Sequence, residues 1–154
     1  MNNYLAIVAD IAAKLAAIDG IGIIQDRPRL TASWAAYIAR FKNNAGRILG
    51  GEISRGRVTE HRRGAFFRHH TFVLRWYLGF QDEAATDAVF QQLVEEICAA
   101  FRLAEPPAGA SWLYQDGDNQ DNSPAQVPVI DERMFGGVLC HHAEIHLSVT
   151  ERIV

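Results

Sequence analysis

The chain of 154 residues has only two cysteines and no long apolar run. Cys98 and Cys140 are too few for a disulfide framework or, by themselves, a zinc ligand set, so we expect two buried free thiols in a reducing compartment. No uninterrupted apolar segment approaches the roughly 20 residues that span a bilayer. The start, Met1-Asn2-Asn3, lacks the basic region of a secretory signal. These absences argue against a secreted, disulfide-stabilised protein and against a membrane protein.

Signatures of catalysis are also scarce. The sequence contains no G-x-S-x-G nucleophile elbow and no phosphate-cradling glycine loop of either common type. His142-Ala143-Glu144 matches the H-x-E of zinc deaminases, but the P-C-x-x-C motif that must follow is missing. We therefore expect no catalytic residue and no cofactor.

Two polar clusters suggest metal ligands at first sight. His142, Glu144 and His146 share one face of a strand, but alternate residues lie roughly 6.6 Å apart, too far for three in a row to reach one ion. A calcium loop beginning at Asp116 would need glycine at its sixth position and glutamate at its twelfth, where the chain has Asp121 and Val127. No metal site is expected at either cluster.

What is present is an ordinary globular composition, with 49% apolar and 21% charged residues, which predicts a single domain over residues 1–154. The segment 66–101 is its centre. Residues 71–78 alternate apolar and polar at the period of a strand with one face in a core. Apolar residues from Val89 to Phe101 then recur at the spacing of a helix that would lie across that face.

The remaining elements complete a two-layer α+β sandwich. We expect a mostly antiparallel sheet of four to five strands with two to three helices packed on one face. Two segments should project as interaction arms, namely a long hairpin over about 46–80 and a long loop over about 104–127. The other expected elements are helices over 5–18 and 31–41, a strand over 21–25, a short strand over 127–130 and a final strand from about 138 to 150.

Charge is distributed unevenly along the chain. Residues 40–75 hold nine arginines and lysines against two glutamates, a balance of 9 − 2 = +7, so the remainder carries −3 − 7 = −10. Such a protein is suited to contacting copies of itself head to side, or to contacting two different neighbours. If the charges are interleaved in space, however, they only solvate the surface.

The order of these features resembles the tail terminator and tail-completion proteins of long-tailed bacteriophages. The resemblance covers most of the chain. It is carried by Arg27-Pro28 before the helix of Trp34-Ala35-Ala36-Tyr37, the basic glycine-rich hairpin, the block Phe72-Val73-Leu74-Arg75-Trp76-Tyr77-Leu78-Gly79 leading into the helix that ends at Phe101, and Gly137-Val138-Leu139-Cys140-His141-His142-Ala143-Glu144 in the final strand.

This resemblance implies a structural virion protein and no enzymatic activity. Family members form a six-membered ring that caps the tail tube, ends tail growth and joins the tail to the head-side connector. The implied partners are copies of the chain, the tail tube protein and a connector or neck protein, with DNA passing through the ring without specific binding and no membrane. Assembly would take place in the host bacterial cytoplasm. We expect Arg55, Arg57, Arg62 and Arg63 at one interface, and Asp116, Asp118 and Asp121 at another.

Other functions remain open at this stage. A neck or head-completion protein of similar fold belongs to the same structural class. A small nucleic-acid-binding regulator that uses the basic hairpin is the alternative from another class, although Arg63-Gly64-Ala65-Phe66-Phe67 matches the aromatic strand of RNA-recognition modules poorly. An enzyme with a histidine-rich site is the third alternative.

Overall fold

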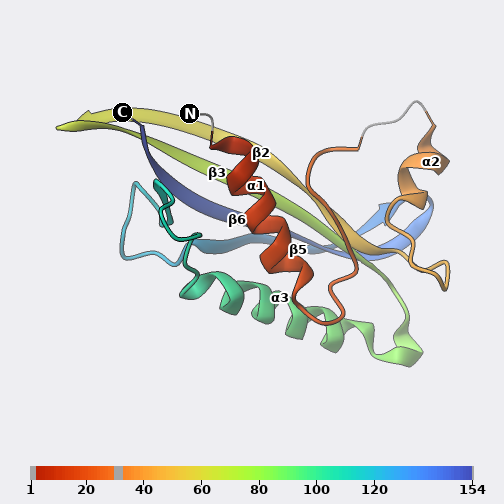
Figure 1. Ribbon diagram of the computed structural model, residues 1–154. Coiled ribbons are helices and arrows are strands. Elements are labelled where there is room, and N and C mark those ends of the chain that lie inside the picture. The colour runs from red at the N-terminus through yellow and green to blue at the C-terminus, as the bar shows by residue number, and fades with distance from the viewer. Residues whose placement is uncertain (1–2, 30–32, 154) are drawn as a thin grey trace.

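The computed structural model describes residues 3–29 and 33–153 and shows an α+β protein with a curled, mostly antiparallel sheet (Figure 1). The strand order is β1-β2-β3-β6-β4, and β5 pairs with β6 along the same edge as β4. Among the described strands, β1 alone runs parallel to its neighbour, and the other pairs are antiparallel. The elements are α1 (Tyr4–Ala16), β1 (Ile23–Gln25), α2 (Trp34–Ala39), β2 (Leu49–Arg63), β3 (Ala65–Gly79), a 3₁₀ turn (Asp82–Ala84), α3 (Thr86–Arg102), β4 (Trp112–Tyr114), β5 (Ala125–Phe135) and β6 (Val138–Ile153).

The long hairpin predicted over 46–80 is present as β2 and β3. The two strands pair antiparallel from Leu49 opposite Leu78 to Arg63 opposite Ala65, and Gly64 at the tip has a positive φ of 70°. That conformation is accessible to glycine without steric cost, which explains the sharp reversal. The far half of the hairpin extends beyond both long helices (Figure 1).

Helices α1 and α3 cover one face of this sheet. Their apolar stripes meet the even-numbered residues of β3, as the sequence pattern predicts. At the centre, the indole of Trp76 stacks on the ring of Phe90 with 4.6 Å between centroids. The indole N–H donates to the carbonyl oxygen of Ile21 at 2.9 Å, so this buried polar group is satisfied.

Helix α2 packs on the opposite face, at the end of the sheet far from the hairpin tip (Figure 1). Ile38 and Phe41 from the α2 region join Phe135 and Cys140 in a second, smaller core. Ser33 caps α2 by accepting a hydrogen bond from the N–H of Ala36. The predicted start of this helix, at residue 31, lies outside the described residues.

The fold class is confirmed, and the structure adds detail to the sequence prediction. The loop expected over 104–127 contains the short strand β4, which pairs with the end of β6, and the strand expected at 127–130 is the much longer β5. The sheet therefore has six strands in the described part of the chain. Within the described residues, no helix is both long enough and apolar enough to cross a membrane.

We expect the contact between Trp76 and Phe90 to dominate the stability of the helix layer. Replacing Phe90, whose side chain is completely buried, by alanine should lower the free energy of unfolding by about 3–5 kcal/mol because it leaves a cavity beside Trp76. The neighbouring Val89 is 47% exposed, and its replacement by alanine should change stability by no more than about 0.5 kcal/mol. Urea unfolding of both variants tests this. Equal losses would show that the layer does not depend on this contact.

Candidate interaction surfaces

The basic hairpin presents its arginines on both faces of the sheet. Arg55 lies opposite Phe72, on the face covered by helices, whereas Arg57 lies opposite Thr71, on the face without long helices. A β-bulge at Gly56 separates them, because one extra residue reverses the side-chain alternation beyond it. A Cβ at Gly56 would lie 2.9 Å from Cγ2 of Val73, so the position is also tight.

Each of the four predicted arginines has a different environment. The guanidinium group of Arg55 lies over the ring of Tyr4, 4.8 Å from its centroid, and that of Arg62 lies over the ring of Phe66 at 5.6 Å. Arg57 lies 3.8 Å from a carboxylate oxygen of Asp118. Arg63 lines a hollow near the hairpin tip. They therefore do not form one continuous basic patch.

The acidic loop is organised by one of its own carboxylates. Asp116 accepts hydrogen bonds from the N–H groups of Asp118 and Asn119 and from the amide of Asn122, at 3.0–3.3 Å. Burial acts to raise the pKa of Asp116, but these hydrogen bonds outweigh it and lower the pKa below its usual value. Asp116 thus holds the loop together, whereas Asp118 and Asp121 are exposed.

The structure brings the two predicted interaction regions together in one subunit. The ion pair of Arg57 and Asp118 joins the hairpin to the acidic loop, and both side chains are about two-thirds exposed, at 66% and 69%. An exposed pair of this kind contributes at most about 1 kcal/mol, so both groups can exchange partners at small cost. That these residues contact neighbouring subunits remains a prediction.

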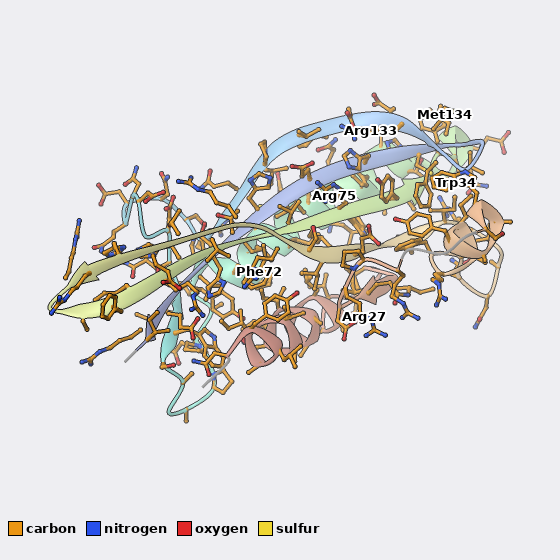
Figure 2. All side chains as sticks on the ribbon, turned by 90° about the horizontal axis from the view of Figure 1, so that it is seen from above. Arg27, Trp34, Phe72, Arg75, Arg133 and Met134 are labelled. Carbon is orange, nitrogen blue, oxygen red and sulfur yellow. The ribbon has the colours of Figure 1, made fainter. Side chains whose placement is uncertain are left out.

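An exposed apolar surface lies at the opposite end of the sheet and was missed in the sequence. Trp34 is 61% exposed and Met134 is 65% exposed, and both lie at the end far from the hairpin tip (Figure 2). Phe80, Val138 and Leu139 add further exposed apolar area. Concentrations of exposed apolar side chains often mark interaction sites. The only signal in the sequence was an aromatic-rich helix next to a glycine turn.

The six histidines all have partners. His142 Nδ1 lies 2.7 Å from Asp131, His146 Nε2 lies 2.8 Å from Glu144, and the remaining four are bonded to Glu151, Thr86, Thr150 and one another. Within the described residues, no group of three or more His, Cys, Asp or Glu side chains is arranged to hold a metal ion. His142, Glu144 and His146 share one face of β6, as expected, but they belong to two separate acid–histidine pairs.

A buried polar group lies beneath the hairpin. The side chain of Glu151 is completely buried, accepts a hydrogen bond from the Asn3 amide at 2.9 Å and lies 2.8 Å from Nε2 of His70. Nδ1 of His70 is buried without a partner among the described residues. This arrangement fits a neutral histidine that donates its Nε2 proton to a carboxylate oxygen of Glu151. Both side chains are completely buried, so neither is accessible to a substrate in solution.

The two cysteines are free thiols, as expected, but only Cys140 is buried, whereas burial was expected of both. Burial raises the pKa of Cys140 to about 11, so its thiol is protonated at neutral pH. Burial likewise raises the pKa of the half-buried Cys98. Neither is suited to act as a nucleophile.

Comparison with known proteins does not assign this chain to a family. No protein-family model matches the sequence, and no curated protein matches it either.

We expect the stability of this protein to fall as the pH drops below about 6.5. Burial lowers the pKa of His70 and of His142, although the neighbouring Glu151 and Asp131 act in the opposite direction. The unfolded chain therefore takes up protons at its ordinary histidine pKa before the folded chain does, which favours unfolding. Each histidine contributes at most about 1.4 kcal/mol per pH unit between its unfolded and folded pKa values.

Urea unfolding between pH 8 and pH 5 checks this expectation. The variant His142→Gln should show a shallower loss of stability below pH 6.5 than the wild type, while the two curves should run parallel above pH 7. A wild-type stability that stays constant or rises toward pH 5 would contradict the role of the buried neutral histidines.

Proposed function

We propose that this protein is a structural subunit that closes into a ring with copies of itself and caps the end of a phage tail tube, ending tail growth and joining the tail to its head-side connector. The resemblance in the sequence suggests the virion context and the six-membered ring. The support from the structure is the open sheet described below. A neck or head-completion protein of similar fold would use the same surfaces with different neighbours.

The observation that carries the proposal is that the sheet is open at both edges. Strand β1 pairs with β2 only as far as Glu52, and from Ile53 to Arg63 β2 has no further strand on its outer side among the described residues. The outer side of β5 also lacks a strand neighbour within the described part of the chain. Rows of unpaired backbone N–H and C=O groups favour pairing with another chain.

The two edges differ in charge. Residues 53–63 of the β2 edge carry four arginines and one glutamate, a balance of +3. Residues 115–135, which form the acidic loop and β5, carry five acidic residues and one arginine, a balance of −4. Opposite charges favour contact between unlike edges over contact between like edges. Repeated contact between unlike edges is heterologous and generates a ring when the rotation per subunit closes.

Each edge also exposes an apolar side chain on the face covered by helices. Val58 on β2 is 38% exposed and Ile130 on β5 is 48% exposed. Their strand partners, His70 and Ala143, are buried on that same face. Pairing of the two edges would therefore bring Val58 and Ile130 to the same side of one continuous sheet, where they would be shielded from water.

The regulator that binds nucleic acid through the hairpin is less well supported. Such binding needs lysines and arginines gathered on one face to track phosphates. The bulge at Gly56 places Arg55 and Arg57 on opposite faces, and Arg57 lies beside Asp118. The hairpin is therefore not a single basic stripe.

Variants that disrupt one edge at a time test the ring. Val58→Asp should repel the acidic edge of the next subunit, and Ile130→Lys should repel the basic edge. Each variant should remain folded but lose the ring formed by concentrated wild-type protein, as measured by light scattering after gel filtration and by electron microscopy. Leu103, 88% exposed at the end of α3, offers matched controls as Leu103→Asp and Leu103→Lys, which should form rings normally.

Mixing the two edge variants sharpens the test. Val58→Asp keeps an unchanged β5 edge and Ile130→Lys keeps an unchanged β2 edge, so a heterologous contact predicts that the mixture associates although neither variant does so alone. The two altered edges carry opposite charges and can pair in turn, so species larger than a dimer are compatible with this contact. A mixture that stays monomeric would contradict the assignment of these edges. Wild-type protein that fails to appear at the end of tail tubes in labelled particles would contradict the proposed function.

A further inference from the structure

A hollow of about 200 Å³ lies beside the hairpin tip on the face without long helices. We call it the tip hollow. It is formed where β2, β3 and β6 meet the segment leading into the acidic loop. The residues that matter below are His61, Arg63, His69, Gln115, Gly117 and Arg152, all of which line it. Ligand pockets for drug-sized molecules are typically about 300–1,000 Å³, so this hollow suits a smaller group.

The tip hollow carries positive charge that is not paired with carboxylates. Arg63 and Arg152 are exposed, and neither guanidinium group has a hydrogen-bond or ion-pair partner among the described residues. No aspartate or glutamate lines the hollow in the described part of the chain. Gln115, Gln120 and Ser111 contribute uncharged donors to the same lining. The arrangement therefore favours an anion.

The nearest carboxylates already have partners. Asp116 and Asp118 flank Gly117, but Asp116 accepts three hydrogen bonds from its own loop and Asp118 lies beside Arg57. Both carboxylates keep their negative charge, but neither forms an ion pair with Arg63 or Arg152. The guanidinium groups of Arg63 and Arg152 therefore remain available to an anion, although the loop that borders the hollow is acidic.

A hydrogen-bond chain fixes the histidines in the floor of the hollow. The hydroxyl of Thr150 donates to the carbonyl oxygen of Gln115 at 3.2 Å, so its oxygen must accept the proton of His69 Nδ1 at 2.8 Å. Nε2 of His69 then accepts from Nδ1 of His61 at 2.9 Å. Burial lowers the pKa of His69, which is consistent with a neutral ring in this chain. Nε2 of His61 is the ring nitrogen left without a protein partner among the described residues.

Gly117 shapes the hollow. A Cβ at this position would lie 1.9 Å from Nδ1 of His69, so only glycine allows the loop to rest against the imidazole ring. The ring of His61 is held from its other side, stacked with Phe67 at 5.7 Å between centroids. The floor is thus fixed before any ligand arrives, which reduces the entropy lost on binding.

We propose that the tip hollow binds a phosphate group. Two guanidinium groups offer several N–H donors in planar forks and match the oxygens of a phosphate better than the two oxygens of a single carboxylate. A charge of two from Arg63 and Arg152 balances a free phosphate dianion and exceeds the single negative charge of a backbone phosphodiester. The phosphate can be a free ion or part of a nucleic acid backbone, and the experiment below separates these sources.

Isothermal titration with inorganic phosphate tests the site in the full-length protein. The wild type should show saturable binding, and Arg63→Gln and Arg152→Gln should each weaken it about tenfold, since each removes charge-assisted hydrogen bonds. Arg62→Gln is the matched control, because it removes the same charge from the neighbouring position, where the guanidinium group lies over Phe66 on the other side of the strand. It should bind phosphate like the wild type.

Two further titrations identify the ligand. Acetate should bind at least tenfold more weakly than phosphate, and equal binding would overturn the choice of phosphate. A short single-stranded oligonucleotide that binds with the same loss in Arg63→Gln and Arg152→Gln identifies a nucleic acid phosphate, whereas binding of inorganic phosphate alone identifies a free ion. Absence of phosphate binding, or an equal loss in Arg62→Gln, would overturn the site. Gel filtration of the same samples reports ring formation separately, so the two proposals can fail independently.

Discussion

The structure depends on the pairing of β3 with β2 on one side and β6 on the other. Both ladders run for most of the length of β3, and their registers fix which residues of three strands share a face. The apolar residues Phe72, Leu74 and Trp76 bind the layer of α1 and α3, and every surface discussed above is placed relative to that layer. A different register would move the residues that form the open edges, the tip hollow and the second core to other faces of the sheet.

The parts predicted well from sequence were those with a strong local period. The alternation through Phe72 and Trp76 and the helical spacing from Phe90 to Phe101 specified the central strand and its covering helix without ambiguity. The two-layer α+β class followed from them. Short elements were harder, because β4 has only three residues and its place is decided by pairing with Glu151 and Val149 far along the chain. No local pattern reports such a contact.

The candidate surfaces were predicted only in part, for a physical reason. Sequence showed that Arg55, Arg57, Asp116 and Asp118 are polar residues in turns and arms, but their relative positions depend on tertiary packing. Asp116 accepts hydrogen bonds from its own loop, whereas Asp118 forms an ion pair with Arg57 on β2. The buried Glu151 would be read as a surface residue in any local pattern. Its burial is possible because Asn3 and His70, from distant parts of the chain, supply donors to it.

The bulge at Gly56 divides the hairpin into two stretches with opposite phase. Before it, the odd-numbered residues of β2 face the core, as Ile53 does, and after it the odd-numbered residues face away, as His61 does. The stretch beyond the bulge, residues 57–63, therefore does not continue the apolar alternation that the helices require of residues 49–55. Evolution can change the identities of the distal residues to suit a new neighbour without disturbing the interior, so long as this one backbone irregularity is kept.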